Sequence, residues 1–298
     1  MRRRLVVILS LSGLLVASAS LSVEATYPGT NDGRLAFGMI VGGNVDVYSV
    51  LPNGDDLRRL TTAPSFDACA SYSPDGKEIA FCSTRSGVSE IWKMKKNGTQ
   101  QVQVTHLGGN ATFPDFSPDG SMIVFGARAG GSNPDIWIVN SDGSGATRLT
   151  SGPDVDMFPA WSPDGSKIVF IRNDQVWTIN ADGGGATQLT FDPAVKGQVP
   201  DWSPDASKIA YNSGDDIWIM NANGGDQHPL FVDPSTIEFG PAWSPVGDQI
   251  AFVSFPLGNL GGRTIYVINA DGTGMHAVHP GPGPQVVPAW QPRGDRID

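Results

Sequence analysis

The chain has 298 residues, of which 40% are hydrophobic and 17% are charged, and its 20 Lys and Arg against 30 Asp and Glu give a net charge of −10. This acidic balance argues against a protein that binds nucleic acid or an anionic membrane through a basic face. Its 37 Gly and 23 Pro fall at repeated positions, so they indicate the turns of a folded domain and not disorder.

Residues 1–25 have the pattern of a signal peptide. Three arginines form a basic start, and residues 5–16 form an apolar run that is short for a bilayer span. Residues 23–25 (Val-Glu-Ala) fit a cleavage site, and residues 17–19 (Ala-Ser-Ala) are a second candidate. We therefore expect residues 26–298 to be exported to the periplasm or the extracellular space, without stable membrane insertion. The alternative is an uncleaved N-terminal anchor.

From residue 33 onward, the sequence repeats one unit. The head of the unit is an aromatic residue followed by Ser-Pro-Asp-Gly or a variant of it, and the six heads begin at Tyr72, Phe116, Trp161, Trp202, Trp243 and Trp290. The steps between these aromatic residues are 44, 45, 41, 41 and 47 residues. A period in the low forties built from short apolar strands is typical of four-stranded propeller blades.

The turns and strands of the unit have local physical reasons. Pro74 presets the backbone for the first central turn position and Gly76 accepts a positive φ, so the head closes a tight hairpin. Strands such as residues 136–139 and 217–220 are apolar at consecutive positions, which predicts that neighbouring blades cover both faces of each sheet. No stretch after the N-terminus has a 3.6-residue apolar period, so we expect an all-β domain with almost no helix.

The two ends of the chain carry complementary parts of one blade. Residues 33–61 supply three strands without a head strand, whereas residues 287–290 supply a head strand with no blade after it. We therefore predict that the C-terminal strand pairs with the N-terminal blade and closes a six-bladed β-propeller of four-stranded antiparallel blades. Such closure removes the exposed sheet edges.

At these residues the chain resembles the TolB-like, WD40-like (PD40) propeller repeats. The resemblance rests on the five heads from Tyr72 to Gly247 and on the strands and turns between them, and it covers residues 33–297. It implies an exported bacterial propeller that binds another protein. TolB itself carries an α/β domain ahead of its propeller, and this chain resembles the propeller alone. Peptidases of the prolyl oligopeptidase type need a hydrolase domain, but the sequence has no Gly-x-Ser-x-Gly motif.

One position of each unit is placed to line a mouth of the central channel. It lies five residues before the head aromatic, in the expected loop into the innermost strand, and four of the units hold Asp67, Asp156, Glu238 and Gln285 there. Three carboxylates and an amide at one mouth indicate a site for a cation, with calcium as the candidate, or for a basic peptide segment. The alternative is that these side chains cap turns or bond to the loop backbone. We expect no other cofactor.

Cys69 and Cys82 are the only cysteines, and they flank one predicted hairpin turn. An exported chain meets an oxidising compartment, so they are candidates for a disulfide, and the alternative is two buried free thiols. The four histidines do not have the spacing of a metal site. The tripeptide of residues 293–295 (Arg-Gly-Asp) occupies a turn position of the repeat, which argues against an adhesion role.

Together these observations favour a monomeric, non-enzymatic module that binds or scaffolds proteins in the cell envelope or the extracellular space. One alternative is an enzyme of the saccharide lyase or hydrolase type that acts at the channel mouth. Its active site would need converging His, Arg and acidic residues, whereas the histidines of this chain are few and scattered in the repeat, and no catalytic residue is identified. Another alternative is a cation-binding domain.

Overall fold

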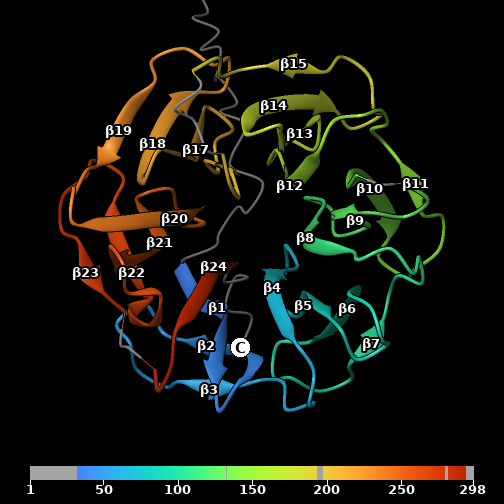
Figure 1. The fold of residues 1–298 in the computed structure, drawn as a ribbon, viewed down its shortest axis with the longest axis horizontal. Coiled ribbons are helices and arrows are strands. Elements are labelled where there is room, and N and C mark those ends of the chain that lie inside the picture. The colour runs from blue at the N-terminus through green and yellow to red at the C-terminus, as the bar shows by residue number, and fades with distance from the viewer. Residues whose placement is uncertain (1–31, 132, 193–196, 279–280, 293–298) are drawn as a thin grey trace, which may run out of the picture.

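The computed structural model describes residues 32–131, 133–192, 197–278 and 281–292. Its strands form six four-stranded antiparallel sheets in a ring, which confirms the predicted six-bladed β-propeller (Figure 1). The predicted signal peptide (residues 1–25) and the Arg-Gly-Asp tripeptide lie outside the described residues. Within those residues, the single helical element is the 3-10 turn η1 (Leu260–Gly262), and no helix is long and apolar enough to cross a membrane.

Each blade runs from an innermost strand at the channel to an outermost strand at the rim. From the channel outward, blade 1 contains β24 (Gln285–Pro292), β1 (Asp32–Val41), β2 (Asn44–Val50) and β3 (Arg58–Arg59). Blade 2 contains β4 (Asp67–Tyr72), β5 (Glu78–Ser83), β6 (Glu90–Lys95) and β7 (Val102–Gln103). Blade 3 contains β8 (Thr112–Phe116), β9 (Met122–Ala127), β10 (Asp135–Asn140) and β11 (Thr147–Arg148).

The remaining three blades follow the same order. Blade 4 contains β12 (Asp156–Trp161), β13 (Lys167–Arg172), β14 (Gln175–Asn180) and β15 (Thr187–Gln188). Blade 5 contains β16 (Asp201–Trp202), β17 (Lys208–Ser213), β18 (Asp216–Asn221) and β19 (His228–Phe231). Blade 6 contains β20 (Thr236–Trp243), β21 (Gln249–Pro256), β22 (Thr264–Asn269) and β23 (His276–Ala277).

The hydrophobic core lies between neighbouring blades. One aromatic position on the second strand is at most 1% exposed in every blade, and its occupants are Phe37, Phe81, Phe125, Phe170, Tyr211 and Phe252. Burying a ring of this size stabilises a fold by about 2 kcal/mol. Because the second strands are covered on both faces, they are apolar and buried at consecutive positions. The strands for which the sequence predicted this, residues 136–139 and 217–220, are third strands and are covered less completely, since Trp137 and Trp218 are only partly buried.

The head turns have the same hydrogen bonds in successive blades. In blade 2, the Ser73 hydroxyl donates to Asp75 Oδ1 at 2.7 Å and accepts the Glu78 N–H at 2.9 Å. The Lys77 N–H donates to the same Asp75 oxygen at 3.0 Å. Gly76 has a φ of 64°, which glycine adopts at no steric cost. Side-chain bonds within the turn therefore fix the hairpin between the first two strands.

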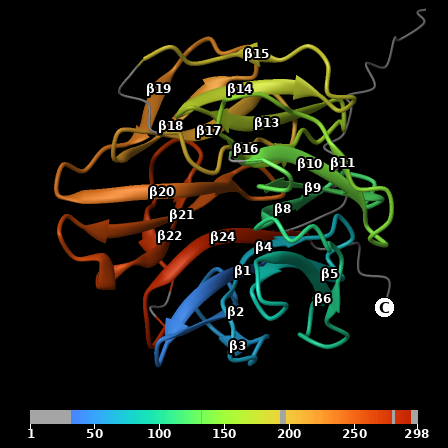
Figure 2. The same cartoon turned by 45° about the vertical axis from the view of Figure 1, so that its right-hand side comes forward.

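The ring closes as the sequence predicted. Strand β24 pairs with β1 so that Trp290 lies opposite Leu35, and Figures 1 and 2 both show the two strands side by side. The Trp290 indole N–H donates to the Ala242 carbonyl of blade 6 at 3.0 Å. The Gln291 amide donates to the Gly76 carbonyl of blade 2 at 2.8 Å. The C-terminal strand thus connects three blades.

In every blade, the residue three positions before the head aromatic has an irregular backbone, and in five blades it lies within the innermost strand, whereas Val199 precedes β16. The residues at this position all have a positive φ, and they are Cys69, Phe113, Phe158, Val199, Gly240 and Val287. The pairing of β4 with β5, of β8 with β9, of β12 with β13 and of β20 with β21 shifts register at this point. A β-bulge therefore recurs around the channel, and it redirects the side chains that line it.

Candidate functional site

The central channel contains a cavity on each side of the bulges. The wide cavity, of about 610 Å³, lies at the end where the innermost strands begin. The narrow cavity, of about 150 Å³, lies at the end of the head turns. Three bulge residues line both cavities, and they are Cys69, Phe113 and Val287. The level of the bulges is therefore the boundary between two differently lined spaces.

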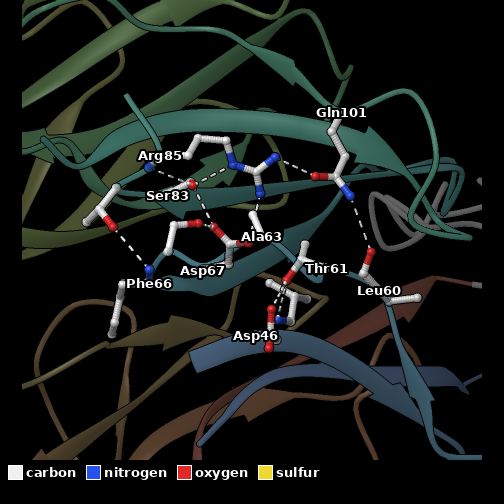
Figure 3. A network of polar contacts seen from close by, with 12 residues as sticks. Asp46, Leu60, Thr61, Ala63, Phe66, Asp67, Ser83, Arg85 and Gln101 are labelled. Carbon is white, nitrogen blue, oxygen red and sulfur yellow. Dashed lines mark hydrogen bonds and ion pairs between the residues drawn. The ribbon is translucent and has the colours of Figure 1, made fainter. Parts of the chain in front are cut away.

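The first predicted mouth residue, Asp67, is fully buried at the start of β4. Its Oδ2 pairs with the Arg85 guanidinium at 2.8 Å and its Oδ1 accepts the Ser83 hydroxyl at 2.5 Å (Figure 3). Arg85 also donates to Gln101 at 2.6 Å, and the Gln101 amide donates to the Leu60 carbonyl of the preceding blade at 3.3 Å. Asp67 is thus neutralised within a network that joins blades 1 and 2.

The second predicted mouth residue, Asp156, has a similar arrangement in blade 4. Both of its oxygens accept hydrogen bonds from the Arg172 guanidinium, at 2.7 Å each. This two-bond geometry is the strong form of an arginine–carboxylate pair. Arg172 lies over the rings of Phe170 and Trp177 at 5.3 and 5.1 Å from their centroids, so the pair is also packed against aromatic surface.

Glu238 is the only one of the four predicted residues that lines the wide cavity wall. It is fully buried, its Oε1 accepts the Ser254 hydroxyl at 2.8 Å, and its Oε2 has no hydrogen-bond partner among the described residues. Burial raises the pKa of Glu238, and the nearby carboxylates of Asp216 and Asp233 raise it further. This acid differs from Asp67 and Asp156 because no arginine neutralises it.

Gln285 has a structural contact at the start of β24. Its Oε1 accepts the Ile265 N–H at 2.7 Å. In four other blades a threonine hydroxyl accepts the equivalent N–H at 2.9 Å, and the threonines are Thr61, Thr105, Thr150 and Thr190. In blade 6, the side-chain oxygen of Gln285 therefore accepts the backbone N–H that a threonine hydroxyl accepts in the other four blades.

The structure places these four positions in the innermost strands and not in loops, because pairing with the second strand already begins there, as with Asp67 opposite Ser83. Among the residues that the structure describes, no three His, Cys, Asp or Glu side chains come together closely enough to hold a metal ion. A calcium or basic-peptide site formed by the four residues stays a prediction.

Two further acidic residues, Asp115 and Asp201, line the narrow cavity. Asp115 accepts the Ser71 hydroxyl at 2.9 Å and the Trp161 N–H at 2.8 Å, which joins blades 2, 3 and 4. Asp201 accepts the Trp243 N–H of blade 6 at 2.7 Å. None of the residues that line this cavity is Lys, Arg or His. Two carboxylates therefore share a confined space without a cationic side chain.

Confinement changes the protonation of this pair. Burial raises the pKa of Asp115 to about 6, although hydrogen bonds from Trp161 and Ser71 lower it. Burial likewise raises the pKa of Asp201 to about 7, and the charge of Asp115 adds to that rise. The repeat alignment held a signal for both residues, because they precede the head aromatic where the other units have Ser or Ala.

The two cysteines are free thiols in the structure. Cys82 is fully buried opposite Ala68, and its Sγ lies 3.2 Å from the Ala68 carbonyl. Burial raises the pKa of the Cys82 thiol well above its usual value, and the adjacent Cys69 raises it further. The bulge at Cys69 brings the pair close together but places Cys69 on the channel wall. The disulfide stays a prediction.

Comparison with known proteins identifies the family. The Tol-Pal system protein TolB of Nitratidesulfovibrio vulgaris is 37% identical over 94 residues, which are 30% of this chain and 20% of that protein. An uncharacterized protein of Agrobacterium fabrum is 34% identical over 80 residues, which are 27% of this chain and 27% of that protein. The similarity thus spans about a quarter or less of the length of these relatives.

The solved structure of TolB from Acinetobacter baumannii superimposes with a TM-score of 0.76 at 22% identity, over 88% of this chain and 67% of that one. At this identity the likeness shows the fold alone. The family model of the TolB beta propeller domain (PD40) matches residues 16–132 and 99–230, which together are well over half of the chain. With the six blades that these repeats form, this match shows that the chain belongs to the TolB beta propeller family.

Proposed function

We propose that this protein is an exported, non-enzymatic propeller that binds or scaffolds another protein through the face at which the wide cavity opens. The observation that carries the proposal is the distribution of exposed apolar side chains. Nine large apolar side chains are exposed in the described part of the chain. Seven of them lie in loops of this one face, and they are Phe66, Val88, Val155, Phe191, Val232, Leu257 and Leu260.

The topology explains why these seven residues share a face. Four precede an innermost strand along the chain and three lie in turns between the second and third strands, and both kinds of loop emerge at the end where the innermost strands begin. The other two residues lie elsewhere, with Val102 on an outermost strand and Val246 in a head turn. Apolar groups gathered around a concave opening are typical of a protein interaction surface.

Export and location are also part of the proposal. Residues 1–25 have the sequence pattern of a signal peptide, which supports export to the periplasm or the extracellular space. One relative is named a Tol-Pal system protein, which supports a place among proteins of the cell envelope. Membership of that system does not follow, because the similarity covers only 20% of that relative.

Site-specific photo-crosslinking in the parent cell tests the proposed face. A photoreactive phenylalanine analogue replaces Phe66 or Leu260 on the proposed face, and Val246 serves as the control because it is 52% exposed in a head turn. We expect one defined protein to be captured from positions 66 and 260 and not from position 246. Capture from position 246 alone, or from none of the three positions, would contradict the proposal.

A further inference from the structure

Three arginines of the described blades lie over pairs of aromatic rings. The guanidinium carbon of Arg85 is 5.4 and 4.7 Å from the ring centroids of Phe81 and Trp92. Arg172 has the same arrangement in blade 4, and each of these two arginines is paired with the buried acid of its own blade, Asp67 or Asp156. In both blades the cation is thus satisfied by a carboxylate and supported by aromatic surface.

Arg263 of blade 6 has the aromatic support without the acid. Its guanidinium carbon is 5.6 Å from the ring centroid of Phe255 and 6.0 Å from that of Phe239. Its Nε is buried and has no hydrogen-bond partner among the described residues, and it forms no ion pair with any of them. The acid at the equivalent position, Glu238, bonds to Ser254 instead.

A guanidinium that packs on aromatic rings and has no acceptor of its own can bind an acceptor group of a ligand. A buried N–H without an acceptor costs about 1–3 kcal/mol, so an acceptor supplied from outside gains that amount. The planar guanidinium presents two parallel N–H groups that match a carboxylate. Because Phe239 and Phe255 hold the plane, the arginine loses little further conformational freedom when a ligand binds.

The surroundings of Arg263 indicate the rest of the ligand. Arg263 lines the wide cavity, whose volume of about 610 Å³ lies within the common range for ligand pockets. Most of the wall is apolar, with side chains that include Phe66, Phe113 and Ile237. Such a wall favours an aromatic or large aliphatic group, and Arg263 favours a carboxylate beside it.

We propose that the wide cavity binds a segment of the partner protein in which one large apolar side chain lies next to one carboxylate, with the carboxylate on Arg263. The inference rests on the proposed protein-binding function and names the chemistry of the segment. The exposed Asp215 and the buried Glu238 line the same cavity and disfavour negative charge there, and only a carboxylate that reaches Arg263 is compensated. A single acid beside an apolar residue is therefore favoured over a run of acids.

A matched pair of small probes tests the inference on the intact protein. N-acetyl-phenylalaninate carries the ring and the carboxylate, and N-acetyl-phenylalaninamide differs from it by the charge alone. We expect the acid to bind about tenfold more tightly than the amide, which is the gain of one charge-assisted pair. Saturation-transfer NMR titrations measure both constants at millimolar ligand.

Variants assign the difference to one residue. Arg263→Gln should abolish the tenfold preference and leave the binding of the amide unchanged. Arg128→Gln is the matched control, because Arg128 is exposed in a loop of the same face and should leave the preference intact. Equal binding of the two probes by the unmodified protein, no binding of either probe, or a preference that survives Arg263→Gln would each overturn the inference. The crosslinking result would stand in all three cases, so the two proposals can fail separately.

Discussion

The paired acids of the narrow cavity make folding stability depend on pH in a defined direction. Asp115 and Asp201 have pKa values of about 6 and about 7 in the folded protein, against an ordinary value of 3.8. Between about pH 4 and pH 7 the folded state therefore binds more protons than the unfolded state at these two residues. Their contribution to stability consequently falls as the pH rises through this window, and it is largest at the acidic end.

The size of the effect follows from the two pKa values. Linkage over the range from pH 5 to pH 8 gives about 1 kcal/mol for Asp115 and about 3 kcal/mol for Asp201, an upper total of about 4 kcal/mol. Both side chains are partly accessible within the channel, so water there screens them and reduces the effect. We expect about 2–4 kcal/mol between the two pH values.

The perturbation is the double variant Asp115→Asn, Asp201→Asn. Asparagine cannot titrate, so the pH-dependent part assigned to these residues disappears, whereas all other groups contribute equally to both proteins. The absolute stability of the variant also changes, because each asparagine replaces one of two hydrogen-bond-accepting carboxylate oxygens by an NH₂ donor; at position 201 both oxygens accept a backbone N–H, from Trp202 and Trp243. The slope of stability with pH, and not its value at one pH, is therefore the informative quantity.

Urea unfolding followed by tryptophan fluorescence measures this slope, since the chain has eight tryptophans. The free energy of unfolding is obtained at half-unit steps from pH 5 to pH 8 for both proteins. We expect the difference between the proteins to change by about 2–4 kcal/mol across the range, with the parent gaining stability toward acid. Parallel curves would refute the reasoning, as would a parent that loses stability toward acid relative to the variant.

Three further measurements address other parts of the structure. Asp67→Asn should destabilise the protein by about 3 kcal/mol, because it leaves the partly buried Arg85 without its carboxylate. Glu238→Gln should cost less, because no ion pair to that acid is lost. Equal losses of unfolding free energy in urea would contradict this assignment. Gly76→Ala should lower the melting temperature more than Gly42→Ala. Both glycines have a φ near 60°, but only at position 76 would a Cβ lie against the Pro292 carbonyl. Similar losses in the two variants would argue against close packing of the Gly76 turn on the C-terminal strand. In the native protein without reductant, iodoacetamide should label only the partly exposed Cys69, and a mass without any label after unfolding would show a disulfide instead.

The fold could be predicted because its signals are local and repeated. The head aromatic with its Ser-Pro-Asp-Gly turn or a variant of it recurs six times, and in blades 2 to 5 a bond between the turn Ser and Asp, such as Ser73 to Asp75, fixes the turn. The closure of the ring also followed from the sequence, since residues 33–61 lack the one strand that residues 287–290 supply. The number of blades and the pairing of the chain ends could therefore be predicted by comparing the repeats, although no single blade shows them.

The site could be predicted less well because its chemistry depends on contacts between distant residues. Asp67 and Asp156 appeared as candidate ligands, but arginines 18 and 16 residues further along the chain neutralise them. The sequence did not single out Arg263, because this arginine is notable only for having no carboxylate partner, and the structure is needed to see that. The repeat position marked where to look in each blade, but it did not show which side chain would be left without a partner.

The bulges explain why the two ends of the channel differ in chemistry. A positive φ costs an L-residue about 1–2 kcal/mol, yet five of the six bulge positions hold residues other than glycine, including the bulky Phe113 and Phe158. Contacts around the ring maintain this geometry, and the two phenylalanine rings meet edge to face with centroids 4.5 Å apart. Because bulge side chains line both cavities, a ligand on Arg263 occupies the wide cavity while Asp115 and Asp201 titrate in the narrow one. The strained ring of bulges therefore places Asp115 and Asp201 in a different cavity from Arg263, which shares the wide cavity with Glu238 and Asp215.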